Sequence, residues 1–256
     1  MDLSRFVDKH VHRLTNHSLV QRIRWKARYL KWLLAGSGPY SDEYVKQVTA
    51  SIAAGNRHGT LSVVLDDPEG ALREASFVAE TVRELGLEPS DVCIEYGCGA
   101  LRIGEPIMKL LEPGNYIGLD VTDRFWKNGI QRLGPDFIER YRPRLELIDD
   151  KRIGELASLN AKVVVCIAVL IHVPPPEVDA FIARLASIMG ERSTLVLDGR
   201  LGRRTRQVHS RTWQHARSRV LRSFARHGLE LVSPEPITRA GLPEELWILR
   251  KTRSRA

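Results

Sequence analysis

The chain has 256 residues, of which 43% are hydrophobic and 27% charged, and this profile excludes wholesale disorder. Its length fits one α/β domain with an extension, or two small domains. The longest uninterrupted apolar run, Val163 to Ile171, has nine residues, against the roughly 20 that a membrane-spanning helix needs. The first residues lack the apolar core of a secretion signal, and three cysteines imply no disulfide framework. We therefore expect a cytoplasmic protein.

The formal charge of +8 is distributed unevenly along the chain. Residues 1–36, residues 199–229 and the tail from Arg250 together carry +19, so the remaining residues carry −11. Basic edges on an acidic body suit an anionic partner such as a phosphate group, a nucleic acid or a lipid headgroup. The alternative is that these side chains cover solvated helix faces.

The N-terminal region is predicted to be helical. Apolar side chains recur at spacings of three and four over residues 19–34, with arginines and lysines on the other faces. Gly36-Ser37-Gly38-Pro39 ends this helix, and residues 40–60 predict a second one. We expect residues 1–65 to form an extension that docks on, or forms a lid over, a domain of residues 66–256. A basic helix with aromatic side chains is also compatible with an anionic membrane surface, which would place the protein at the membrane periphery.

From residue 68 onward the pattern alternates between helices and strands. Helices are predicted over residues 68–85, from the glycine turn to about residue 111, over residues 176–189 and from about residue 213 to 227. Strands are predicted over residues 92–96, 116–119, 145–148, 163–170, 194–197, 229–232 and 246–250. Such alternation is typical of a parallel sheet with helices on both faces.

The segment Glu95-Tyr96-Gly97-Cys98-Gly99 predicts a tight turn between the first of these strands and a helix. Glycines permit positive φ and close approach of a ligand, and free N–H groups at a helix N-terminus favour a negative group. Asp120 follows 21 residues after Gly99, at the end of the second strand, where a carboxylate can accept hydrogen bonds from both ribose hydroxyls. The pair indicates an adenosine-containing cofactor. A dinucleotide fingerprint would need a third glycine at position 102, which is Arg102 here.

The order of these motifs resembles that of the class I S-adenosylmethionine-dependent methyltransferases over roughly residues 70–250. The resemblance implies a Rossmann-like, seven-stranded α/β sheet with helices on both faces and S-adenosylmethionine (SAM) as the cofactor. It implies cofactor contacts from ten residues: Glu95, Gly97, Cys98, Gly99, Arg102, Asp120, Val121, Asp149, Asp150 and Ala168.

Three specific roles are expected among these residues, and two of the roles have alternatives. The resemblance implies that Asp120 holds the ribose and that an Asp after the third strand accepts from the adenine amino group. For Asp149 and Asp150 the alternative is capping of a helix that begins near residue 151. Arg102 is a candidate for the methionine carboxylate or for a surface salt bridge.

The sequence departs from the family pattern at two positions. The third glycine of the first motif is Leu101 here, which predicts a different loop shape. Lys162 stands where many members have an Asp that opens the fourth strand.

Methyl transfer from a sulfonium needs in-line positioning and, for a hydroxyl acceptor, a base. His172, after the fourth strand, is the first candidate for that base, and His209 and His215, on either side of Trp213, are the next. Asp198, at the end of the fifth strand, is a candidate for orienting such a histidine or binding a polar acceptor. The alternative for each is a hydrogen-bonded structural residue. No Cys/His spacing resembles a zinc site, so we expect no metal.

The favoured function is O-methylation of a small polar metabolite, sugar or glycan intermediate held under residues 199–228. Trp213, His209 and the arginines of that segment suit a ring and an anionic group. The arginine clusters make an RNA methyltransferase an alternative, but no Asn-Pro-Pro-aromatic motif follows the fourth strand and Cys166 lies inside it. A non-catalytic binding protein on the same fold is disfavoured because Gly97, Gly99 and Asp120 are all in register.

Overall fold

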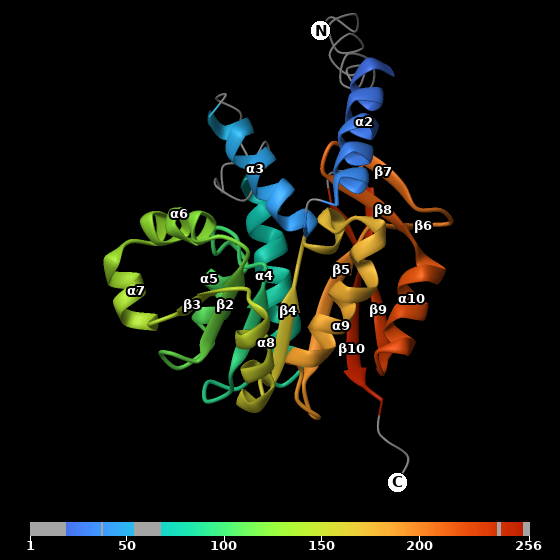
Figure 1. The fold of residues 1–256 in the computed structure, drawn as a ribbon. Coiled ribbons are helices and arrows are strands. Elements are labelled where there is room, and N and C mark those ends of the chain that lie inside the picture. The colour runs from blue at the N-terminus through green and yellow to red at the C-terminus, as the bar shows by residue number, and fades with distance from the viewer. Residues whose placement is uncertain (1–18, 37, 54–67, 240–241, 253–256) are drawn as a thin grey trace, which may run out of the picture.

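A seven-stranded sheet forms the centre of the computed structural model, which describes residues 19–36, 38–53, 68–239 and 242–252 (Figure 1). The strands are β1 (Cys93–Tyr96), β2 (Tyr116–Asp120), β3 (Arg144–Leu147), β4 (Val163–Cys166), β5 (Thr194–Gly199), β9 (Leu229–Arg239) and β10 (Leu242–Lys251). Their order is β3-β2-β1-β4-β5-β10-β9. The first five are parallel, and β10 is antiparallel to both β5 and β9. The predicted α/β sheet is confirmed.

Helices cover both faces of this sheet because consecutive apolar residues of a strand point to opposite faces, which makes both faces apolar. Val163 and Val165 of β4 lie in a core with α4, α5 and α6, whereas Val164 and Cys166 lie in a second core with α8, α9 and α10. These helices are α4 (Pro68–Glu84), α5 (Gly104–Met108), α6 (Asp123–Leu133), α8 (Asp150–Leu156), α9 (Val178–Ile188) and α10 (Arg217–Arg226); α7 (Pro135–Tyr141) follows α6. Three short 3₁₀ turns are η1 (Ala157–Leu159), η2 (Leu170–His172) and η3 (Pro175–Glu177).

Two N-terminal helices, α2 (Leu19–Ala35) and α3 (Tyr40–Ala53), stand over the edge of the sheet where the parallel strands end (Figure 1). Tyr40, Tyr44 and Val48 recur every four residues on one face of α3 and form a third core with Phe125 of α6 and Trp213. The Tyr40 backbone N–H also donates to Glu177 Oε1 at 2.8 Å. The predicted helical N-terminal region is therefore present. Its predicted boundary between residues 65 and 66 lies outside the described residues.

The predicted helix over residues 213–227 is wrong at its start. Residues between β5 and α10 form a small sheet of β6 (Leu201–Gly202), β7 (Arg206–His209) and β8 (Thr212–Ala216), in the order β6-β8-β7. Trp213 and His215 of β8 are buried while the residues beside them are only partly buried, which is the two-residue period of a strand. The helix α10 therefore begins at Arg217.

Three other elements differ in length from the prediction. The fourth strand ends at Cys166 rather than residue 170, because Ala168 has a φ of +62° and a 3₁₀ turn follows. The helix after the glycine turn is the short α5, which ends at Met108. The final hairpin is longer than predicted, and β9 accommodates Pro234 and Pro236 because it is the outermost strand of the sheet among the described residues.

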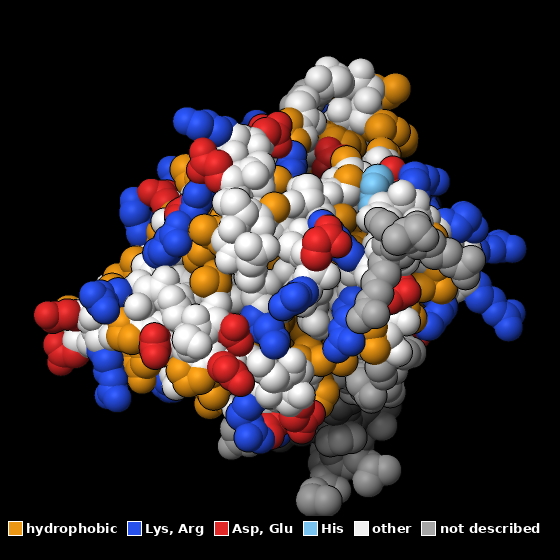
Figure 2. Space-filling model, turned by 90° about the horizontal axis from the view of Figure 1, so that it is seen from below, with side chains coloured by type: hydrophobic (Ala, Val, Ile, Leu, Met, Phe, Trp, Pro, Cys, Tyr) orange, Lys and Arg blue, Asp and Glu red, His pale blue; other side chains and the backbone are white. Residues whose placement is uncertain are grey.

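The end of the molecule opposite α2 and α3 has a mixed charge. Figure 2 shows Lys and Arg side chains lying among Asp and Glu side chains over this end. In the part of the chain that the structure describes, no helix combines the length and apolar character needed to cross a bilayer.

Candidate active site

Two backbone hydrogen bonds join the glycine turn after β1 to the neighbouring strand β2. The backbone N–H groups of Gly97 and Cys98 both donate to the Leu119 carbonyl, at 2.7 and 2.9 Å. Gly97 has a φ of +84° and Gly99 a φ of +50°. A Cβ at position 97 would lie 2.3 Å from Cγ2 of Val169, so only glycine fits between the turn and the loop that follows β4.

Leu101 occupies the position of the missing third glycine and keeps the backbone conformation that glycine favours, with a φ of +60°. The loop was expected to change shape at this position, but the backbone of Leu101 keeps the left-handed conformation. A left-handed conformation costs an L-residue about 1–2 kcal/mol. The Leu101 side chain is fully buried among α4, α5 and α6 residues, and this burial offsets the strain.

Asp120 ends β2 directly beside this turn. Its Oδ2 accepts a hydrogen bond from the Gly99 N–H at 2.8 Å, and its Oδ1 accepts from the Val121 N–H at 2.7 Å. Burial raises the pKa of Asp120 to about 6, although these backbone donors and that of Thr122 oppose the shift. The predicted pairing of a glycine turn with a carboxylate is thus present in the structure, where Asp120 fixes the turn.

Glu95 and Arg102 have protein partners in the structure. Glu95 is buried in β1 and accepts a hydrogen bond from the Tyr116 hydroxyl, and burial raises the pKa of its carboxyl to about 8. Arg102 forms a salt bridge from Nη1 to Glu74 Oε2 of α4 at 2.7 Å, and burial lowers its pKa. This pair corresponds to the salt-bridge alternative, but its side chains are only 16% and 19% exposed rather than on the open surface.

Asp149 and Asp150 lie at the start of α8. Asp149 is the N-cap, since its Oδ1 accepts from the Arg152 N–H at 2.8 Å, as the capping alternative predicted. Asp150 is exposed and pairs with Arg184 at 2.8 Å. Of the remaining cofactor candidates, Cys98 is buried and Val121 is 39% exposed.

Asp198 and Ala168 are directly linked. Asp198 is fully buried at the end of β5, and its Oδ1 accepts from the Ala168 N–H at 2.7 Å. Ala168 has a positive φ, which the hydrogen bond helps to hold. Through this contact Asp198 positions the loop after β4.

His172 lies at the end of η2, between α3 and the turn that joins β7 to β8. Its Nδ1 is 2.7 Å from the Arg211 carbonyl oxygen, and its ring centroid is 4.7 Å from that of Tyr44. A carbonyl oxygen only accepts hydrogen bonds, so Nδ1 carries the proton and the lone pair of the neutral ring lies on Nε2. This hydrogen bond fixes the tautomer of the neutral His172 ring.

The other two histidines lie in different surroundings. His215 is fully buried with Nε2 3.1 Å from the Leu170 carbonyl oxygen, and burial lowers its pKa to about 4, as expected for a structural residue. His209 is exposed on β7, with its ring 6.0 Å from that of Trp25 in α2. Tyr44 and Arg211, which do contact His172, carry no signal in the sequence that pairs them with it.

No protein-family model and no curated protein matches the sequence. Solved structures do match its fold. Magnesium protoporphyrin IX methyltransferase from Synechocystis PCC 6803 with bound S-adenosylhomocysteine (SAH) is 17% identical, with a TM-score of 0.61 over 82% of this chain and 98% of that chain. The 1,6-didemethyltoxoflavin-N1-methyltransferase of Burkholderia thailandensis, also with SAH, is 17% identical, with a TM-score of 0.61 over 85% and 92%.

The glycopeptide N-methyltransferase MtfA, complexed with sinefungin, is 15% identical, with a TM-score of 0.54 over 71% of this chain and 94% of that chain. These likenesses show that the chain has the class I SAM-dependent methyltransferase fold.

Proposed function

We propose that the protein is a SAM-dependent methyltransferase that transfers the methyl group to an oxygen of a small polar acceptor. One observation carries the cofactor: the buried Asp120 carboxylate stands against the Gly97–Gly99 turn, at the sheet edge where five parallel strands end. Ligands of open α/β sheets bind at this edge. The structures of the same fold that hold SAH or sinefungin support the same cofactor.

The residues of this edge fit an adenosyl group. Asp120 would accept hydrogen bonds from the ribose hydroxyls, the role that a carboxylate at the end of the second strand can take in an open α/β sheet. Asp198 is proposed as a positioning residue, because it holds Ala168 in the loop that would border the cofactor. Val121, exposed beside Asp120, would contact the adenine ring of the cofactor. SAM, when bound, supplies an electrophilic methyl group.

The chain itself would supply the acid–base chemistry. Nε2 of His172 is proposed to take the proton of the acceptor hydroxyl, while the Arg211 carbonyl and the Tyr44 ring keep the imidazole in place. The helices α2 and α3 are proposed as the lid, because their aromatic core with Phe125 and Trp213 closes over the sheet edge that carries His172. A closed lid excludes water, which would favour transfer to the acceptor.

Calorimetric titration with SAM, SAH and NAD tests this function. We expect micromolar binding of SAH, loss of at least tenfold in affinity in Asp120→Ala, and no comparable binding of NAD. The matched control is Asp136→Ala, which removes an exposed carboxylate at the start of α7 and should bind SAH as the wild type does. Binding of NAD in place of SAH, or SAH binding unaffected by Asp120→Ala, would overturn the proposal.

A further inference from the structure

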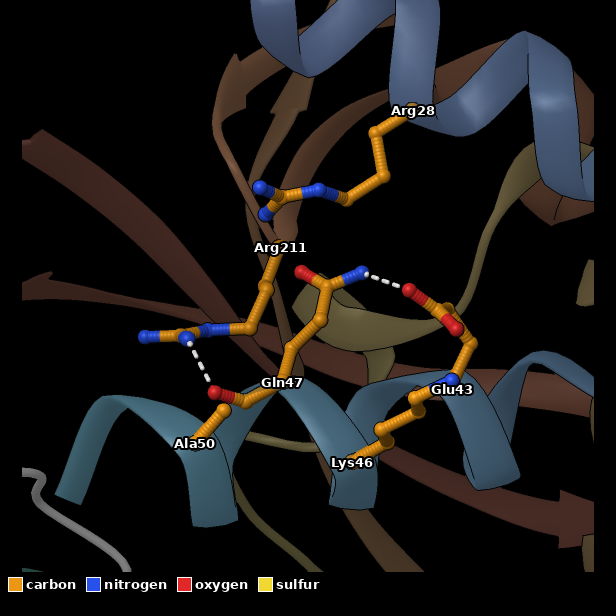
Figure 3. A pocket seen from close by; sticks show the side chains of 6 residues that line it. All are labelled: Arg28, Glu43, Lys46, Gln47, Ala50 and Arg211. Carbon is orange, nitrogen blue, oxygen red and sulfur yellow. Dashed lines mark hydrogen bonds between the residues drawn. The ribbon is translucent and has the colours of Figure 1, made fainter. Parts of the chain in front are cut away.

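A pocket of about 390 Å³ lies between the two N-terminal helices and the β7–β8 turn (Figure 3). Its lining consists of Arg28 from α2, four residues of α3, and Arg211 from the turn; the α3 residues are Glu43, Lys46, Gln47 and Ala50. Figure 3 shows Arg28 extending from α2 toward Arg211, whose side chain reaches the backbone of Gln47 on α3. Segments separated by more than 160 residues in the sequence thus meet at this pocket.

The lining is strongly cationic. Three side chains are basic and one is acidic, for a formal charge of +2. The single carboxylate, Glu43, accepts a hydrogen bond from Gln47 Nε2 at 2.7 Å, and the Arg211 guanidinium donates to the backbone carbonyl of Gln47 at 3.4 Å. Within the described residues, no carboxylate forms an ion pair with Arg28, Lys46 or Arg211. Guanidinium groups that converge without a counter-ion favour an anion between them, because it relieves their repulsion.

The pocket also offers an acceptor atom. Oε1 of Gln47 is buried and has no hydrogen-bond partner among the residues that the structure describes. A buried acceptor without a partner is unfavourable, and a hydroxyl of a ligand would satisfy it. The lining therefore suits a ligand that carries both an anionic group and a hydroxyl.

Arg211 connects the pocket to His172. Its side chain lines the pocket, while its backbone carbonyl accepts the hydrogen bond from His172 Nδ1. On the other side, Tyr44 packs on the His172 ring and precedes Gln47 by three residues, on the same face of α3. The pocket is thus linked to the candidate base through Arg211 and, on α3, through Gln47 and Tyr44.

We propose that this pocket binds a phosphoryl group of the methyl acceptor and thereby directs the acceptor's hydroxyl toward His172. A phosphate dianion matches the formal charge of +2, and guanidinium groups bind phosphate oxygens through pairs of parallel hydrogen bonds. The identification of the bound molecule as the acceptor rests on the proposed function, whereas the anion site itself does not.

Titration of the full-length protein with inorganic phosphate tests the site. We expect millimolar binding of phosphate, at least tenfold weaker binding of acetate, and a loss of tenfold or more in Arg28→Gln and Arg211→Gln. The matched control is Arg222→Gln, which removes an exposed guanidinium from α10 and should leave phosphate affinity unchanged. Equal affinity in all four proteins, or acetate binding as tightly as phosphate, would overturn the proposal.

The link to His172 has its own readout. Phosphate should shift the ring-proton NMR signal of His172, assigned with the variant His172→Gln, and the shift should disappear in Arg211→Gln. That substitution retains the backbone carbonyl that holds Nδ1, so it separates the pocket from the positioning of the ring. A His172 signal that does not shift at saturating phosphate would refute the link between the pocket and His172.

Titration of SAH with the same samples distinguishes the two proposals. If SAH binds while phosphate does not, the pocket assignment fails and the proposed function stands. If phosphate binds through Arg28 and Arg211 while SAH does not bind, the cofactor assignment fails, and with it the identification of the anion as part of a methyl acceptor.

Discussion

Replacement of Gly97 by alanine should both destabilise the protein and weaken SAH binding. Two separate costs arise at this position. The residue has a φ of +84°, which is unfavourable for alanine by about 1–2 kcal/mol. The added Cβ would also lie 2.3 Å from Cγ2 of Val169, and such an overlap in a packed region costs about 1–3 kcal/mol. The expected loss of unfolding free energy is therefore about 2–5 kcal/mol.

Gly114 offers a matched control for the first cost. It has a φ of +93°, and a Cβ there would meet nothing within 4 Å. Gly114→Ala should therefore lose only the backbone contribution, about 1–2 kcal/mol. Both substitutions restrict the unfolded chain to the same extent, so this contribution cancels in the comparison. The difference between the two variants measures the overlap with Val169.

Urea unfolding followed by tryptophan fluorescence gives both free energies, and calorimetry gives the SAH affinity of each variant. The account predicts that Gly97→Ala is less stable than Gly114→Ala by at least about 1 kcal/mol. We also expect that only Gly97→Ala loses SAH affinity, because relief of the overlap with Val169 displaces the glycine turn. Equal stability of the two variants, together with normal SAH binding by Gly97→Ala, would refute the reasoning.

Three further predictions concern carboxyl groups. Glu95→Gln should change the unfolding free energy at pH 7 by less than about 1 kcal/mol, because the buried carboxyl is protonated at that pH. Glu95→Ala should cost about 2–4 kcal/mol, because it leaves the Tyr116 hydroxyl unpaired in a cavity. Wild type should also lose stability as pH rises from the unfolded pKa of Glu95 toward 8, and Glu95→Gln should not; identical pH profiles would contradict this. Asp120 has a raised pKa of about 6, so SAH affinity should rise with pH through 6 and be about tenfold weaker at pH 5 than at pH 8, a dependence that Asp120→Asn should lack in calorimetry. Asp149→Ala should cost about 1 kcal/mol in thermal or urea unfolding through loss of the α8 cap, and an unchanged stability would argue against that capping role.

The sheet and its glycine turn were predictable because their signals are local. Short apolar runs such as Val163 to Cys166 identify buried parallel strands, and glycines mark the turn where side chains do not fit. Asp120 followed from its place at the end of the second strand. The conformation of Leu101 did not follow, since leucine disfavours positive φ and only the surrounding packing imposes it.

The surroundings of His172 depend on tertiary contacts that no local pattern encodes. The spacing of Tyr40, Tyr44 and Val48 indicates a buried helix face, but not that the face covers a histidine 128 residues after Tyr44. The sequence of β8 favours a helix, because Trp213 and the arginines that follow also fit an amphipathic helix. Its extended form comes from pairing with β6 and β7, which is again a contact between segments.

A crystal structure of the protein with SAH would be the most direct test of the proposed cofactor site, because it would show which atoms the ligand contacts. The account predicts that both ribose hydroxyls lie within hydrogen-bond distance of the Asp120 carboxylate, with the adenosyl group over the Gly97–Gly99 turn. SAH bound elsewhere, or bound at this edge with Asp120 still engaged only by the N–H groups of Gly99 and Val121, would contradict it.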